Sequence, residues 1–432
     1  MFVSSSRLDL NVVVGPLTPG HIKSILSGHL PIIIDYPHSD TCGQTDLCTI
    51  GSALWRLSAA LGRRDRVHEI SFEGCGVAFK RFIRATNYHF PALESLNIFF
   101  APDHEPNIPA TFLRGPDLSD LRLRRLELNG GSLISYSGLL SSVTALTDLT
   151  LSVGSNAGPS DPTQLSSFLA CLQGMQCIHS LDPTTPYHPR DFFPSQHSVP
   201  KENIVAMSEL THIRYLGHPI FLDYLMSGLS APFLQDARFV PCTEFPCLSR
   251  VIDDVREEFR SVSVLFDIYN FYLLSSTHSG EIDRFKPSSF KFRFNLGCSP
   301  ISIKSMSSKP STKLAMAEEL TLNVHSSNLT RQEHVSWVRE FLRQFRSVRI
   351  LRVNPFVREV ALYLRQDDDR EAIFPVLEKI ELLISRSGSS DEEYERSAEA
   401  LAALEPCERA GRLVNVSHSE QTETQSRNTE PW

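Results

Sequence analysis

Cysteine and histidine, the side chains that most often bind metal ions or act as nucleophiles, are dispersed along this chain. Its 432 residues include nine cysteines and fifteen histidines. No two cysteines form a CxxC pair, and none lies beside a histidine at the spacing of zinc ligands. We therefore expect buried, reduced thiols, no metal site and no cofactor.

Two short segments come closer to known chemical sites. Gly154–Gly158 resembles a phosphate-binding loop, but no lysine follows and Pro159 comes next, which favours a flexible turn. Asp367–Asp369 resembles a cation site, but Arg365 and Arg370 flank it, as they would at a solvated helix end. The sequence contains no nucleophile elbow, HExxH motif or GxGxxG after a strand. We therefore predict that the protein is not an enzyme and has no catalytic residues.

The overall charge and the short apolar runs indicate which kinds of partner this chain is not expected to bind. The formal net charge is -8 and the pI is about 6.0, which argues against a nucleic-acid-binding surface. Apolar runs such as Leu30–Ile34 are too short to cross a bilayer, and Met1–Ser4 lacks the features of a signal peptide. We expect an intracellular protein, cytoplasmic or nuclear, with no membrane and no nucleic acid among its partners.

A repeated pattern of apolar residues indicates the elements of the fold. Phe90–Ile98 and Phe374–Leu382 have nearly the same sequence pattern. In both, a first apolar residue, which we call an anchor, is followed by a second anchor three residues later and by a third anchor two residues after the second. The last two anchors share one face of a short strand. Copies of this pattern recur about thirty residues apart, as in stacked repeats. Their first anchors are Val67, Leu93, Leu123, Leu146, Ile178, Leu210, Leu234, Ala317, Val348 and Leu377, with two weak copies near Val262 and Phe292.

Helical segments alternate with these strands. We expect helices at 79–89, 164–175, 221–229, 250–262 and 331–345. This order predicts an α/β protein, an irregular leucine-rich-repeat solenoid like that of ribonuclease inhibitor, with a parallel sheet on the concave face and helices outside. An ordinary α/β domain with a doubly wound sheet is the alternative.

The predicted repeats do not cover the whole chain. Residues 1–62 form an N-terminal linker or cap region, in which 8–14 and 30–36 look like strands, and residues 63–388 form the solenoid. Residues 389–413 would be a C-terminal capping helix. Residues 414–432 would be a disordered tail, since the sequence beyond His418 has no apolar periodicity.

The outward side chains of the strands are the candidate binding residues. Since the second and third anchors point into the core, the residues beside and between them face the concave surface. Aromatic and arginine side chains are enriched in interface hot spots. We predict a protein-binding surface formed by Asn97, Phe99, Arg125, Glu127, Thr150, Arg214, Arg238, Thr321, Arg352 and Glu381. Asn129, His212, Asn323, Asn354 and Lys379 are expected on the same face.

Several motifs give the chain a family resemblance. Arg7–Leu10, Leu30–Tyr36, Ala59–Val67 and Phe90–Leu96 make it similar to the F-box and leucine-rich-repeat-like proteins of mushroom-forming fungi. The resemblance implies the substrate-binding repeat region of a cullin-based ubiquitin ligase. An F-box would begin with a helix-rich Leu-Pro-x-Glu segment, and no such segment is evident here.

Two functions are therefore open. The chain is either a monomeric recognition module for an unknown protein target, or a structural or degenerate copy with no retained partner. A Skp-type adaptor would be a partner only if an F-box lies outside this chain.

Overall fold

The computed structural model forms two compact units, Met1–Ala231 and Pro232–Trp432, which we call unit 1 and unit 2 and describe separately. The structure describes residues 32–36, 63–74, 76–85, 88–100, 108, 112, 122–154, 162–185, 204–241, 248–266, 270–276, 292–297, 310–324, 332–353, 373–385, 398, 401–402, 404–405 and 413–419.

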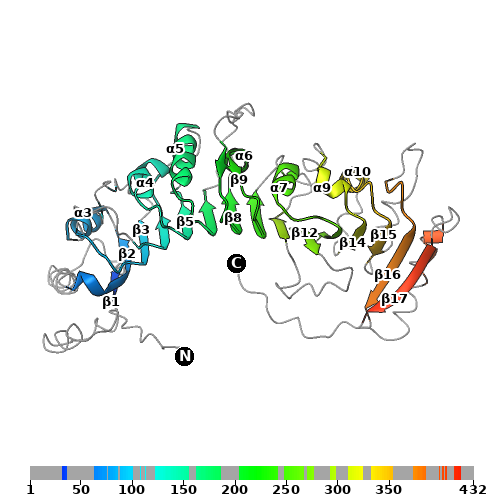
Figure 1. The fold of residues 1–432 in the computed structure, drawn as a ribbon, viewed down its shortest axis with the longest axis horizontal. Coiled ribbons are helices and arrows are strands. Elements are labelled where there is room, and N and C mark those ends of the chain that lie inside the picture. Colours follow the sequence, from blue (N-terminus) through cyan, green and yellow to red (C-terminus); the bar gives the residue numbers. More distant parts are fainter. Residues whose placement is uncertain are drawn as a thin grey trace. The chain divides into compact units, whose positions relative to one another are not determined.

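Unit 1 contains a sheet in which all paired strands are parallel (Figure 1). Its strands follow one another in sequence order, apart from β7, which lies elsewhere. They are β1 (Ile32–Tyr36), β2 (Val67–Gly74), β3 (Ser95–Phe100), β4 (Arg125–Asn129), β5 (Asp148–Ser152), β6 (Ser180–Thr184) and β8 (His212–Gly217). Sequential parallel pairing requires a crossover between neighbouring strands, and among the described residues an α-helix lies between β2 and β3, between β4 and β5, and between β5 and β6.

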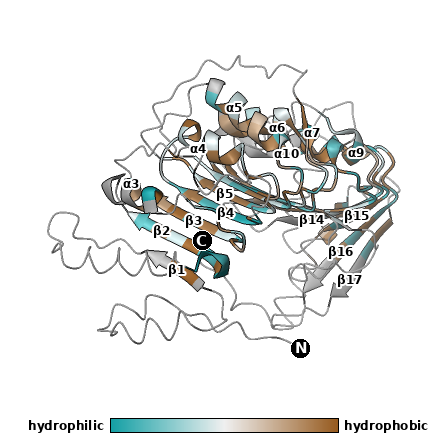
Figure 2. Cartoon of the chain, turned by 60° about the vertical axis from the view of Figure 1, so that its left-hand side comes forward, coloured by the Kyte–Doolittle hydropathy of each residue, from teal (hydrophilic) through white to brown (hydrophobic). Residues whose placement is uncertain are grey.

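The described α-helices of unit 1 lie on one side of its sheet (Figure 1). They are α3 (Gly76–Ala85), α4 (Leu133–Leu140), α5 (Pro162–Gln173) and α6 (Pro219–Gly228), and a short 3-10 helix, η2 (Arg64–Arg66), directly precedes β2. A separate parallel pair is formed by β7 (Val205–Ala206) and β9 (Leu229–Ser230). Figure 2 shows hydrophilic and hydrophobic residues alternating along β3, β4 and β5, with α4, α5 and α6 over one face.

The core of unit 1 is built from the predicted anchors. Leu96, Leu126, Leu149, Leu181 and Ile213 are in register across neighbouring strands and are each at most 2% exposed. Next to β2, the rings of Phe72, Phe79, Phe82, Phe100 and Phe112 form a contiguous aromatic cluster. Burying such side chains is the main favourable term in the folding of each unit.

The same backbone turn precedes the strands in both units. In this turn, the backbone N–H of the first anchor donates a hydrogen bond to the carbonyl of the residue three positions earlier. These hydrogen bonds run from Leu93 to Phe90, Ile178 to Met175, Leu210 to Met207, Ala317 to Leu314 and Leu377 to Phe374. The carbonyl of the residue after the first anchor accepts two hydrogen bonds from backbone N–H groups at the start of the next strand. The Arg124 carbonyl, for example, accepts from the N–H groups of Thr147 and Asp148. The three-anchor pattern thus marks a physical repeat of backbone structure.

Unit 2 contains a mixed sheet with the strand order β10-β13-β12-β11-β14-β15-β16-β17. Its strands are β10 (Asp236–Pro241), β11 (Ser261–Phe266), β12 (Asn270–Ser276), β13 (Phe292–Gly297), β14 (Glu319–Val324), β15 (Ile350–Val353), β16 (Lys379–Ser385) and β17 (Leu413–Ser419). Among these pairs, β12 is antiparallel to both β11 and β13, and the remaining pairs are parallel.

Helices α7 (Leu248–Asp254), α9 (Thr312–Ala315) and α10 (Gln332–Leu342) accompany this sheet, and residues 398, 401–402 and 404–405, within the predicted capping helix at 389–413, are also helical. Asp253 connects α7 to α9, because its Oδ1 accepts hydrogen bonds from the Ser311 hydroxyl at 2.7 Å and from the Lys313 backbone N–H at 3.2 Å. Ser311 caps α9 by accepting from Leu314, and Gln344 accepts from the Ser311 N–H. These bonds satisfy polar groups that would otherwise be buried without partners.

The α/β class and the large parallel sheet are confirmed, with parallel strands at Leu96, Leu149 and Leu351. The sequence did not predict β12 or the inversion of strand order around it. The helix predicted at 250–262 is wrong in its second half, since α7 ends at Asp254 and β11 begins at Ser261.

The predicted ends of the chain also differ from the structure in part. The predicted strand at 30–36 is present as β1, whereas the one at 8–14 lies outside the described residues. The predicted tail begins at residue 414, but 413–419 form β17, which pairs with β16. Val414 and Val416 alternate with polar residues, as in a strand with one apolar face. The strand was not predicted because the surrounding tail is mostly polar.

Candidate protein-binding surface

The strands of unit 1 present polar side chains on the face opposite the described helices, and we call this surface the polar face. Because side chains alternate along a strand and the strands are in register, these residues form rows that cross the sheet. The first row contains Glu69, Ser95, Arg125, Asp148, Ser180 and His212, and the middle row contains Ser71, Asn97, Glu127, Thr150, Asp182 and Arg214. The third row contains Glu73, Phe99, Asn129, Ser152, Thr184 and Leu216.

Carboxylates occupy the middle row on both sides of Thr150. Glu127 accepts a 2.9 Å hydrogen bond from Nδ2 of Asn129, and Asp182 lies on the other neighbouring strand. Burial raises the pKa of Asp182, the Arg214 guanidinium lowers it and Glu127 raises it, and the net direction is upward. The ionised form of Asp182 is therefore less stable than in water, despite the neighbouring arginine.

Apolar side chains are exposed near both ends of the third row. Phe99 is 37% exposed and Leu216 is 43% exposed, on strands separated by β4, β5 and β6. Between them lie the smaller polar side chains of Asn129, Ser152 and Thr184. Such a row offers apolar contact at two points and hydrogen bonding between them.

The first row carries a loose ion pair. Nε of Arg125 lies 3.9 Å from Oδ2 of Asp148, and the two side chains are 77% and 46% exposed. At the far end of the row, Nδ1 of His212 lies 2.7 Å from Oγ1 of Thr211. An exposed pair at this distance contributes little to stability and leaves Arg125 available to a partner.

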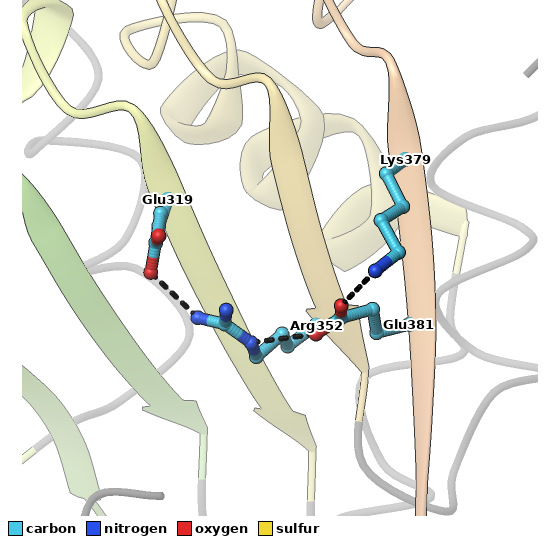
Figure 3. A network of polar contacts seen from close by, with 4 residues as sticks. All are labelled: Glu319, Arg352, Lys379 and Glu381. Atoms are coloured by element: carbon cyan, nitrogen blue, oxygen red, sulfur yellow. Dashed lines mark hydrogen bonds and ion pairs between the residues drawn. The ribbon is translucent and has the colours of Figure 1, made fainter. Parts of the chain in front are cut away.

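The corresponding face of unit 2 holds a closed charge network (Figure 3). Arg352 on β15 donates from Nη1 to Glu319 on β14 at 2.7 Å and from Nε to Glu381 on β16 at 2.8 Å. Lys379 makes a second ion pair with Glu381 at 2.5 Å. Burial lowers the pKa of Arg352, but the hydrogen bonds to Glu319 and Glu381 raise it further, so the net pKa lies above its usual range.

Other outward positions of unit 2 are also engaged or buried. Arg238 contacts Asp236 of its own strand, with Nη2 3.1 Å from Oδ2. Thr321 stands in register between Ser263 and Arg352. Ser263 and Leu274 are 2% and 6% exposed, although they alternate with inward residues, so this part of the face is not accessible.

The structure places all ten predicted binding residues on outward strand positions. Six lie together in unit 1, namely Asn97, Phe99, Arg125, Glu127, Thr150 and Arg214, and four lie in unit 2, namely Arg238, Thr321, Arg352 and Glu381. In unit 2 the two arginines have carboxylate partners within the unit. Asn354 and the side chain of Asn323 lie outside the described residues.

Sequence reasoning missed Asp182 and Glu319. Asp182 was overlooked because Pro183 occupies the third-anchor position of its strand, so the copy was recognised by two anchors only. Glu319 directly precedes the second anchor of its strand, as Arg125 does, and the alternation of period two would have found it.

Fold and surface together define an α/β protein of repeated strand and helix units with a polar sheet face. No protein-family model and no curated protein matches the chain. None of the helices that the structure describes is long and apolar enough to cross a membrane. Within the described ranges, no three His, Cys, Asp or Glu side chains converge as metal ligands would.

Proposed function

We propose that this chain is a non-enzymatic protein-recognition module of the leucine-rich-repeat type, which binds an extended segment of another protein across the polar face of unit 1. The observation that carries the proposal is the third row of this face, where exposed Phe99 and Leu216 flank polar Asn129, Ser152 and Thr184. Exposed aromatic and arginine side chains on a rigid scaffold are typical of interface hot spots.

The dimensions of this face suit a short peptide segment. Neighbouring strands are about 4.8 Å apart, so the six strands from β2 to β8 span about 24 Å. An extended chain rises about 3.3 Å per residue, so about seven residues would cross the face. The leucine-rich-repeat assignment is supported by the repeated turn before the strands and by sequential parallel pairing.

The resemblance to F-box and leucine-rich-repeat-like proteins supports a more specific role. By this resemblance the bound protein would be a substrate presented for ubiquitin transfer. Contact with a Skp-type adaptor would need an F-box, which would lie outside the residues of this chain.

Capture of partners from an extract of a mushroom-forming fungus tests the proposal. The full chain would be compared with a Phe99→Ala/Arg214→Ala variant, in which one apolar and one charged side chain are removed from the polar face. The matched control is Ile134→Ala/Arg84→Ala, because Ile134 and Arg84 are exposed on α4 and α3. A protein retained by the wild type and the control, but lost with the polar-face variant, supports recognition. If all three retain the same proteins, or none, the structural alternative with no retained partner is favoured.

A further inference from the structure

The polar face of unit 1 carries an excess of negative charge. Its carboxylates are Glu69, Glu73, Glu127, Asp148 and Asp182, and its guanidinium groups are Arg125 and Arg214. Arg125 lies 3.9 Å from Asp148 in a loose, exposed ion pair, and the five carboxylates outnumber the two guanidinium groups on this face. A partner of complementary charge would therefore be basic.

The excess is concentrated around Thr150. Glu127 and Asp182 flank this threonine in register, and two strand spacings place their Cα atoms about 10 Å apart. Arg214 lies on the far side of Asp182, and the hydrogen bond that Glu127 accepts comes from the neutral amide of Asn129. The position between the two carboxylates holds a short, uncharged side chain.

Unit 2 contains a related arrangement that includes a cation, although there only Glu381 is in register with the central residue Arg352, and Glu319 is in register with Ile350. There, Glu319 and Glu381 also belong to strands on either side of a central strand, and Arg352 of that strand bridges both. In each unit the central strand places one outward residue between two carboxylate-bearing strands, and this residue is Arg352 in unit 2 and Thr150 in unit 1. Unit 2 neutralises its carboxylates internally, whereas unit 1 leaves the central position without a positive charge.

We infer that the segment bound by unit 1 is basic, and that one of its lysine or arginine side chains lies over Thr150 between Glu127 and Asp182. This inference rests on the proposed function and specifies the chemistry of its partner. Two apolar side chains of the same segment contact Phe99 and Leu216, which lie four strand spacings, or about 19 Å, apart. A segment of about six extended residues spans that distance. A nucleic acid is disfavoured, because its phosphates would meet carboxylates on this face.

Selection from a displayed library of random twelve-residue peptides tests the inference on the full chain. We expect enrichment of peptides with a central lysine or arginine between apolar residues. The affinity of synthetic versions of the selected peptides should fall at least about tenfold in Glu127→Gln/Asp182→Asn, and should weaken with added salt. The control Asp65→Asn removes an exposed carboxylate from η2 and should leave affinity unchanged.

A second variant supplies the missing cation from the protein itself. Thr150→Arg should bridge Glu127 and Asp182 as Arg352 bridges its partners, and should block the basic peptides while leaving the protein folded. Basic peptides that bind Glu127→Gln/Asp182→Asn or Thr150→Arg as tightly as wild type overturn the inference. Enriched peptides that lack basic residues, but depend on Phe99, also overturn it while the proposed recognition role stands. If no peptide is enriched, both proposals fail.

Discussion

Nε of Arg352 donates a 2.8 Å hydrogen bond to Oε2 of Glu381 on the neighbouring strand, with both side chains only 17% exposed. The other arm of the guanidinium binds Glu319, so one arginine holds together three consecutive strands. A half-buried arginine with two carboxylates is held more firmly than an exposed pair, because less water competes for its hydrogen bonds. This network is therefore expected to stabilise unit 2.

Replacing Arg352 with methionine should destabilise unit 2 by about 1–3 kcal/mol, because two poorly exposed carboxylates lose their common cation. Urea unfolding measures this change. The control is Arg260→Met, since Arg260 and its partner Glu258 are both at least 75% exposed, and the expected cost is about 0–0.5 kcal/mol. Equal effects of the two substitutions would show that the network contributes no more than a surface pair.

The network should also make stability depend on acid pH. Burial raises the pKa of Glu381, but hydrogen bonds from Lys379 and Arg352 lower it more, so the folded-state pKa lies below the ordinary value of 4.5. The contribution of Glu381 is therefore complete above pH 4.5 and is lost as the pH falls through the depressed pKa. Urea unfolding of wild type and Glu381→Gln between pH 7 and pH 3 should show a difference that shrinks at the acid end. A difference that grows towards acid would contradict the assignment.

Asp182 should show the opposite dependence. Burial raises its pKa, Arg214 lowers it and Glu127 raises it, so the folded-state pKa lies above the ordinary value of 3.8. Ionisation of this group therefore costs stability, and the loss accumulates as the pH rises from 3.8 through the raised pKa. Asp182→Asn should have a higher Tm than wild type at pH 7, and the difference should disappear below pH 3.8. A lower Tm for Asp182→Asn at pH 7 would mean that Arg214 already compensates the charge.

The sequence predicted strand positions more reliably than strand direction. Alternation of apolar and polar residues correctly located Leu96, Leu149 and Leu351 on inward positions, since burial of one face requires that period. β12 was not predicted as a strand, and because alternation is the same in parallel and antiparallel strands, it would not have shown that β12 runs against β11 and β13. The direction of a strand depends on which neighbours it pairs with.

The candidate surface was predictable residue by residue, but its charge pairing was not. Outward positions follow from the period of two, which placed Arg352 and Glu381 on one face. Glu381 and Glu319 lie 29 and 33 residues from Arg352, and only the register between strands brings them together. The difference between the two units, in which carboxylates flank a cation at Arg352 and a neutral side chain at Thr150, therefore depends on the strand register and could not be found from the sequence alone.

A buried hydrogen-bonded turn, which we call the corner, fixes the C-terminal end of β8, the strand that carries Leu216. The Tyr215 hydroxyl donates to the His218 carbonyl at 2.6 Å and lies 2.7 Å from the Thr185 hydroxyl, which accepts from the His218 N–H. Gly217 sits inside this corner with φ +141°, and a Cβ there would lie 2.2 Å from Oγ1 of Thr185. A side chain is therefore excluded both by the backbone conformation and by space.

Two substitutions at this corner should lower the free energy of unfolding by different amounts. Tyr215→Phe removes one hydroxyl from the buried hydrogen bonds and should cost about 1–3 kcal/mol. Gly217→Ala should cost more, since it adds backbone strain of about 1–3 kcal/mol to a steric clash. Gly174→Ala is the control, because the nearest atom to its added Cβ is 3.4 Å away. Urea unfolding gives the three values, and peptide binding by Gly217→Ala should weaken because Leu216 precedes the displaced residue. If Gly217→Ala is as mild as Gly174→Ala, the corner tolerates a side chain and does not fix the position of Leu216.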